Sequence, residues 1–215
     1  MKLLSINTSK KVDIEYKGKT VTTGIFKNPV RGKVFVGKGN LEGDEQADLK
    51  NHGGQDMAVY AFSFDHHSFW KKQLGRKELK YGLFGENLTI AGLQEEEIYI
   101  GEQFRIGSCI LEVSQPRVPC FKLNMALENR FATKILTSSF NCGVYFRVIE
   151  EGHIESGDLF NKIFKAPGSV SVQSLFRALF DKQFSNAREV LQIASTLKPL
   201  SQEWKEKATK RLSKL

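Results

Sequence analysis

Short apolar or alternating runs, separated by turns that contain glycine, fill the first two-thirds of the chain. They cover residues 3–6, 12–16, 21–26, 33–36, 57–62, 86–90, 103–106, 109–113 and 144–149. Runs of this length are typical of β-strands, and glycine between them is typical of turns. Many short strands at this spacing favour a β-barrel or sandwich over an alternating βαβ sheet. We therefore predict a mainly β fold.

Helical spacing interrupts this pattern and then replaces it. Among the strands, helices are predicted at residues 63–74, 119–128 and 129–137. After Pro167 and Gly168 the apolar residues recur at helical spacing in three further segments, the last of which is basic. We therefore predict a β-barrel domain with a few inserted helices over residues 1–166, and a small C-terminal three-helix domain over residues 167–215.

The placement of charge limits the class of partner. The 215 residues include 32 Lys and Arg against 24 Asp and Glu, a net charge of +8. Residues 1–27 carry +4, residues 28–165 carry −1 and residues 166–215 carry +5. Because the central segment is balanced and no aromatic platform accompanies the basic tail, nucleic-acid binding is disfavoured. The surplus at the two ends favours a protein partner instead.

Cysteine usage and apolar run lengths bear on the compartment. Cys109, Cys120 and Cys142 lack the C-x-x-C spacing and the number needed for a disulfide framework, a closed zinc site or an iron–sulfur cluster. No run provides a signal-peptide core or the roughly 20 apolar residues of a membrane span. We expect a cytoplasmic protein with reduced thiols and no membrane contact. Cys109 lies inside a predicted strand, where a place in the core is expected. Cys142 precedes Gly143 at the start of another, where a structural role is expected.

Cys120 differs from the other two because of its neighbours in the segment 115–122, QPRVPCFK. The two prolines exclude a regular strand, and Pro119 suits the first position of a helix. This places Cys120 in the first helical turn, where exposed N–H groups, Arg117 and Lys122 favour a thiolate. A thiolate is a nucleophile and a ligand for soft metals. A small apolar plug at a strand-to-helix corner remains the alternative.

Two polar segments rich in glycine are candidate ligand loops. The first, residues 43–56, ends with His52, Gly53, Gly54, Gln55 and Asp56. Paired glycines let backbone N–H groups approach an anion closely, although a wide turn capped by Asp and Asn is the alternative. In the second, residues 82–87, Asn87 is placed to contact a polar ligand, and a strand-entry turn is equally consistent. Neither segment has the dinucleotide or P-loop spacing.

The remaining histidines favour structural interpretations. His66 and His67 are adjacent, and side chains of adjacent helical residues point about 100° apart, so they do not form one ligand face. We interpret them as a surface pair. His153 is expected at the tip of a hairpin.

Taken in order, several of these motifs resemble one family. They are Gly43-Asp44-x-Gln46-x-Asp48-x-x-x-His52-Gly53-Gly54-x-Asp56-x-Ala58-Val59-Tyr60, Gly85-Glu86-Asn87-Leu88, Gln115-Pro116-Arg117-x-Pro119-Cys120, Gly143-Val144-Tyr145-x-Arg147-Val148 and Gly157-Asp158. Their order and spacing resemble the MOSC domain, which is found at the C-terminus of molybdenum cofactor sulfurases. The similarity is to its stand-alone bacterial branch, linked to 6-hydroxylaminopurine resistance, and the final helices are similar to that branch's three-helix extension.

The resemblance implies a β-barrel that binds the molybdenum cofactor, molybdopterin, with Cys120 as the functional sulfur and molybdenum ligand. The other residues expected at the cofactor are His52, Gly53, Gly54, Gln55, Asp56, Asn87, Arg117 and Lys122. The implied activity is reduction of N-hydroxylated substrates such as 6-hydroxylaminopurine-like bases. A sulfur carrier with a persulfide on Cys120 and a non-catalytic cofactor-binding module are the alternatives.

The source of electrons must lie outside this sequence. It contains no dinucleotide or flavin motif and no cysteine cluster. We therefore expect a separate flavin or iron–sulfur reductase as partner, with the basic helical end as a candidate docking surface. The sequence does not indicate the oligomeric state.

Overall fold

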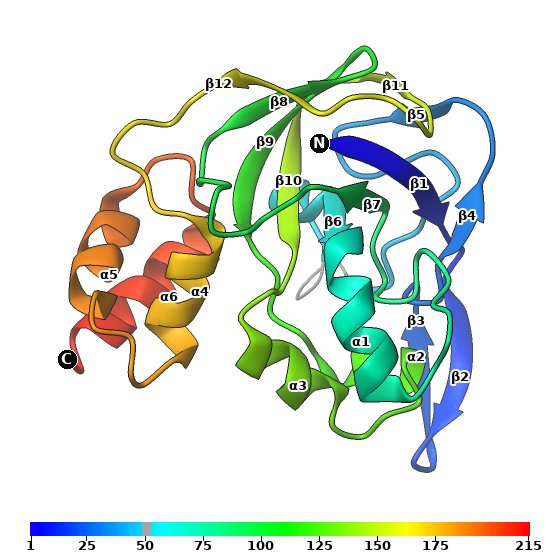
Figure 1. Cartoon of the computed structure of the whole chain (residues 1–215), viewed down its shortest axis with the longest axis horizontal. Coiled ribbons are helices and arrows are strands. Elements are labelled where there is room, and N and C mark those ends of the chain that lie inside the picture. The colour runs from blue at the N-terminus through cyan, green and yellow to red at the C-terminus, as the bar shows by residue number, and fades with distance from the viewer. Residues whose placement is uncertain (49–52) are drawn as a thin grey trace.

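The computed structural model describes residues 1–48 and 53–215 and contains one eight-stranded curled sheet (Figure 1). The order of its strands is β12-β8-β9-β10-β6-β7-β1-β4. The bounds of these strands are β1 Lys2–Thr8, β4 Asn28–Val30, β6 Val59–Ser63, β7 Leu88–Ala91, β8 Gln103–Ile106, β9 Cys109–Pro116, β10 Val144–Glu150 and β12 Asn161–Phe164. The predicted mainly β fold is confirmed, with the 21–26 strand ending early, at Thr23.

Strand pairing in this sheet is antiparallel except between β6 and β7, among the residues that the structure describes. A parallel pair needs a crossover connection. Here the crossover contains the 3₁₀ turn η2 (Phe64–His66), the helix α1 (His67–Leu74) and the turn 82–87. The parallel pairing places that turn beside the start of β6. There the N–H of Asn87 donates to the carbonyl of Tyr60 at 2.8 Å.

Two further pairs of strands flank the large sheet. β2 (Val12–Tyr16) and β3 (Lys19–Thr23) form a hairpin whose turn residues Lys17 and Gly18 both have positive φ, as a type I′ turn requires. β5 (Val34–Val36) pairs with β11 (Gly152–Ile154). The prediction of His153 at a hairpin tip is therefore wrong, since it lies inside β11 opposite Phe35.

Six α-helices complete the described residues: α1, α2 (Phe121–Ala126), α3 (Ala132–Ser139), α4 (Val172–Phe180), α5 (Ala187–Thr196) and α6 (Gln202–Leu212). Figure 1 shows α4, α5 and α6 at one side of the sheet, near β8 and β9, and the hairpin β2–β3 at the other. Among residues 1–48 and 53–215, none of the helices is long and apolar enough to cross a bilayer.

The core is continuous from the barrel into the C-terminal helices. Barrel residues such as Phe104 and helix residues such as Leu175 and Trp204 belong to one buried cluster. Cys109 and Cys142 are fully buried in it, as predicted, and burial raises the pKa of the Cys109 thiol to about 12. A second cluster, with Phe62, Trp70, Phe84 and Leu123 among its members, lies beneath α1, α2 and α3. The proposed boundary at 166/167 thus separates two parts that share apolar packing.

Candidate functional site

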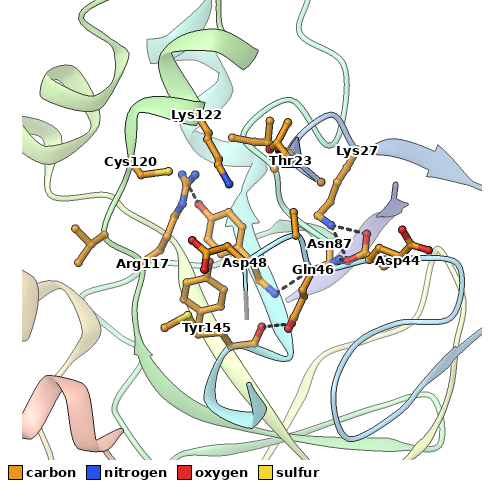
Figure 2. Close-up of a pocket in the computed structure, with 18 residues that line it drawn as sticks. Thr23, Lys27, Asp44, Gln46, Asp48, Asn87, Arg117, Cys120, Lys122 and Tyr145 are labelled. Carbon is orange, nitrogen blue, oxygen red and sulfur yellow. Dashed lines mark hydrogen bonds and ion pairs between the residues drawn. The ribbon is translucent and has the colours of Figure 1, made fainter. Parts of the chain in front are cut away.

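A cavity of about 110 Å³ opens between the hairpin, the segment 44–48, the turn 85–87 and the connection from β9 to α2 (Figure 2). Its walls include the thiol of Cys120, the cations Lys27, Arg117 and Lys122, the acids Asp44, Glu45 and Asp48, and the phenols Tyr60 and Tyr145. Figure 2 shows Cys120, Arg117 and Lys122 on one side of this cavity and Lys27, Asp44 and Asn87 on the other. The site therefore has two chemically different sides.

Cys120 is half-buried and occupies the N-cap of α2, in extended backbone with φ −117° and ψ 174°. Its carbonyl accepts the N–H of Leu123 at 2.9 Å. The prediction that Cys120 lies inside the first helical turn is therefore wrong, because the helix begins two residues later than predicted, at Phe121. The physical reason is the pairing with β10, which continues past Pro116, since the N–H of Arg117 donates to the carbonyl of Gly143 at 3.4 Å. Residues 117–120 lie outside any helix or strand, and the helix begins only after Cys120.

Arg117 brings a buried positive charge to the thiol side of the cavity. The residue is 6% exposed, its guanidinium lies 4.8 Å from the centre of the Tyr60 ring, and Nη1 donates to the Tyr60 hydroxyl at 3.4 Å. Burial opposes the charge, but Tyr60, Tyr145 and the Cys120 thiol together raise the pKa of Arg117. These are the largest influences on that charge. Because Arg117 and Cys120 line the same cavity, this positive charge would attract an anionic ligand there.

The two tyrosines form the wall behind Arg117. Their ring centres are 5.1 Å apart, and the hydroxyl of Tyr60 donates to the carbonyl of Cys142 at 3.0 Å. Burial raises the pKa of both phenols, so both hydroxyls stay protonated near neutral pH. Both tyrosines lie in the sequence motifs, but they were not among the predicted site residues.

The opposite side of the cavity is a closed hydrogen-bond network. Lys27 Nζ donates to both carboxylate oxygens of Asp44, and the side-chain amide of Asn87 donates to Asp44 at 2.9 Å and to the carbonyl of Asn7 at 3.4 Å. The Asn87 Oδ1 accepts the N–H of Tyr60 at 3.1 Å. Asn87 lines the cavity, but its donors and acceptor bind the protein itself. Its role in this structure is to hold Asp44 and the backbone of Tyr60 in place in the cavity wall.

Glu86 explains why the turn before β7 has its shape. Its fully buried carboxylate accepts the N–H groups of Gly82 and Phe84 and the hydroxyl of Thr89, at 2.7, 3.0 and 2.8 Å. Burial raises the pKa of this carboxyl, although these hydrogen bonds oppose the shift. Gly82 has φ +80°, and a Cβ there would lie 2.7 Å from the carbonyl oxygen of Lys27. The buried Glu86 of the motif Gly85-Glu86-Asn87 thus fixes the turn that forms part of the cavity wall.

The glycine segment lies mostly outside the lining of this cavity. Gly53, Gly54, Gln55 and Asp56 are not among the residues that line the cavity, and His52 lies outside the described residues. Asp56 is held away from the cavity by Arg147, whose Nη2 lies 2.6 Å from its carboxylate. The N–H of Gly54 donates to the side chain of Gln46 at 3.3 Å. The ends of the segment, at residues 44–48 and at Met57, do reach the cavity.

Lys122 joins the hairpin to the thiol side of the site. Its Nζ donates to the carbonyl of Thr22 at 3.1 Å, and the ring of the preceding Phe121 stacks on Tyr16, with centres 5.8 Å apart. The hairpin therefore forms one rim of the cavity and is fastened there by α2. Lys27, in contrast, carries no sequence signal, because its buried environment arises only from long-range contacts.

The histidine pair is not on the surface, so that interpretation is wrong. His67 is 2% exposed and lies among aromatic rings, where burial, with nearby Lys71, lowers its pKa to about 4. His66 is half-buried and its Nε2 lies 2.8 Å from the Glu95 carboxylate. Among residues 1–48 and 53–215, no group of three or more His, Cys, Asp or Glu side chains is arranged to hold a metal.

Comparisons with known proteins agree with the sequence motifs. The family model described as MOSC domain matches residues 48–161. The protein YflK of Bacillus subtilis (strain 168) is 37% identical over 215 residues, covering 99% of this chain and 95% of its own. A protein named "Reductase" from Gibberella moniliformis (strain M3125 / FGSC 7600) is 33% identical over 167 residues, which cover 75% of this chain and 30% of the fungal one. The crystal structure of YiiM from Geobacillus stearothermophilus has a TM-score of 0.81 and 30% identity, with 98% of each chain covered.

Proposed function

Because the chain belongs to the MOSC domain family, in its YiiM-like branch, we propose that it binds a molybdenum–pterin cofactor and reduces N-hydroxylated bases of the 6-hydroxylaminopurine type. The observation that carries the proposal is the juxtaposition of the Cys120 thiol and the buried Arg117 guanidinium in one cavity. The name of the fungal relative supports a reductive activity.

The residues on the thiol side suit such a cofactor. A thiolate is a good ligand for a soft metal, and Arg117 keeps a buried positive charge in the same cavity. Cys120 would hold the metal, and Arg117 with Lys122 would hold the anionic groups of the pterin. When bound, the cofactor supplies two-electron exchange with the N–O group of the substrate.

The protein's own residues prepare this side of the site. The positive charge of Arg117 favours the thiolate form of Cys120. Tyr60 and Tyr145 hold Arg117 from behind, and their protonated hydroxyls add no negative charge. The Lys27–Asp44–Asn87 network makes the facing wall rigid, because its members bind one another.

The overall reaction balances with two electrons and two protons. The hydroxylamino group takes them up, its N–O bond breaks, and the products are an amino group and water. The electrons come from a separate flavin or iron–sulfur reductase. The protons come from water at the open rim of the cavity.

The test is to produce the chain in a host that makes the molybdenum cofactor. Molybdenum and pterin are then quantified, and reduction of 6-hydroxylaminopurine is followed with reduced methyl viologen as electron donor. We expect about one metal per chain, cofactor-dependent amine formation, and loss of metal and activity in C120S but not in C109S. Protein that retains neither molybdenum nor pterin contradicts the proposal.

The same thiolate environment also suits a sulfur carrier, which is the second candidate. A persulfide at Cys120, detected by mass spectrometry in metal-free protein that transfers sulfur, would favour it. Bound cofactor without reduction by several donors would favour a cofactor-binding module.

A further inference from the structure

A fully buried carboxylate, Glu95, lies outside the cavity and has no role in the reaction proposed above. Its two oxygens have different partners. One accepts the N–H of Gly143 at 3.0 Å, and the other lies 2.8 Å from His66 Nε2. Burial opposes a charge on His66, but Glu95, with Asp65 and Glu96 nearby, raises the pKa of that ring. The carboxylate is thus held at both oxygens.

The Gly143 end of this contact leads to the site. Gly143 has φ +78°, and a Cβ there would lie 2.6 Å from the carbonyl oxygen of Ala61 and 2.8 Å from the Tyr60 hydroxyl. The peptide segment Cys142–Gly143 therefore packs directly against Tyr60. Nothing larger than glycine fits, so the position of this segment depends on backbone hydrogen bonds.

Arg117 depends on the same segment at both of its ends. Its main-chain N–H donates to the carbonyl of Gly143 at 3.4 Å. Its guanidinium donates to the Tyr60 hydroxyl, which in turn donates to the carbonyl of Cys142 at 3.0 Å. A shift of the segment would therefore move the backbone and the charged group of Arg117 together.

We propose that Glu95 is a positioning residue: by holding the Cys142–Gly143 segment it fixes the Arg117 guanidinium beside Cys120, and His66 fixes the second oxygen of Glu95. The two possible effects of Glu95 on Cys120 have opposite signs. As a negative charge it reduces the positive potential at the thiol, whereas as a brace for Arg117 it maintains that potential. Substituting Glu95 distinguishes the two effects, because they change the potential at Cys120 in opposite directions.

The experiment measures the potential at Cys120 without any cofactor, so its outcome is independent of the proposed function. Full-length metal-free protein is alkylated at pH 7 with iodoacetate, which is anionic, and with iodoacetamide, which is neutral. Modification of the Cys120 peptide is quantified by mass spectrometry, and the ratio of the two rate constants reports the local charge. In R117Q we expect this ratio to fall about fivefold, the scale set by one nearby unit charge in a watery site.

Two variants of Glu95 test the brace. E95L removes the acceptor for Gly143, and we expect the ratio to fall about twofold or more, in the direction of R117Q. E95Q removes the charge but keeps an acceptor oxygen, so its ratio should equal or exceed that of the native chain. The matched control is E102L, which removes another buried carboxylate, one bound to Lys162 and the N–H of Tyr99. It should lower stability and leave the ratio unchanged.

An unchanged or higher ratio in folded E95L would overturn the proposal, because it would leave Glu95 as a charge or a packing group only. If E95L does not fold, H66L takes its place. This variant leaves the Gly143 contact but releases the other oxygen of Glu95. A smaller fall in the ratio supports the brace, and no change overturns it.

Discussion

Lys27 and Asp44 form an ion pair that is almost completely removed from water, with Nζ 2.5 and 2.6 Å from the two carboxylate oxygens. The residues are 7% and 6% exposed. Burial lowers the pKa of Lys27, and the contact with Asp44 counteracts that shift. Because Asp44 also accepts hydrogen bonds from the N–H of Ser9 and the amide of Asn87, the pair organises one whole wall of the cavity.

Breaking this pair should be costly. K27M leaves a buried carboxylate without its cation, and we expect the free energy of unfolding to fall by about 3–5 kcal/mol. D44N should cost a similar amount, and the double variant K27M/D44L should recover part of the loss because no buried charge remains. Urea denaturation measures all three.

The control for this prediction is K207M in the exposed pair Lys207–Glu203 on α6. Its cost should stay below about 1 kcal/mol. Equal costs for K27M and K207M would contradict the buried character of the cavity wall.

The three cysteines should differ in thiol reactivity, and their substitutions should differ in their effect on the free energy of unfolding. Cys109 and Cys142 are fully buried, and burial raises the pKa of both thiols. We therefore expect a maleimide reagent to label Cys120 alone in the folded chain. C109S places a hydroxyl in an apolar core and should cost about 1–3 kcal/mol, whereas C120S should change stability by less than about 0.5 kcal/mol. Labelling of Cys109 at the rate of Cys120 would be inconsistent with the packing.

Arg147 should couple the glycine segment to the C-terminal helices. Its guanidinium contacts Asp56, Glu112 and the carbonyl of Pro199, at 2.6, 2.6 and 2.8 Å. R147M should lower the free energy of unfolding by about 2 kcal/mol and speed amide hydrogen exchange both near Asp56 and near Pro199.

For Arg147 the matched control is R177M, which removes a local ion pair with Asp181 at one end of α4. Because this guanidinium also lies over the rings of Phe140 and Phe184, exchange should change around α4 and these two rings, and not near Asp56. If R147M changes exchange on one side of the contact and leaves the other unaffected, the two parts are not coupled through this residue.

Acid should destabilise the protein through His67. Its pKa of about 4 in the folded chain lies below the usual value of 6.5. Between these values the unfolded chain binds a proton that the folded chain does not, so the free energy of unfolding falls as the pH decreases through this window. We expect His67 to account for about 3 kcal/mol between pH 7 and pH 4.

Urea midpoints of the native chain and H67F at several pH values measure that contribution. H67F should show a shallower loss of stability towards acid. His66, with its raised pKa, acts in the opposite sense, because its contribution is present below pH 6.5 and is lost above its own pKa. Identical pH profiles for the native chain and H67F would rule out His67 as a buried neutral ring.

The sequence predicted local features well and long-range contacts poorly. Alternating runs predicted most strands because side-chain periodicity is local, and the strand position of Cys109 predicted its burial. The N-cap position of Cys120 depends on the contact between Arg117 and Gly143, 26 residues apart. The orientation of Asp56 depends on Arg147, 91 residues away. His67 is buried because α1 packs onto Phe84, and adjacent spacing alone gave no sign of that contact.

The parallel pairing of β6 with β7 has a consequence for the order in which the molecule assembles. Strands joined by a crossover cannot pair as a local hairpin, so their contacts form only after a long loop closes. The cavity also needs Tyr145, which β10 brings against β6. During synthesis, at about 5–20 residues per second, a nascent chain therefore has no complete cavity until β10 has left the ribosome. Any ligand of this site must be loaded after that point, onto strands that are already paired.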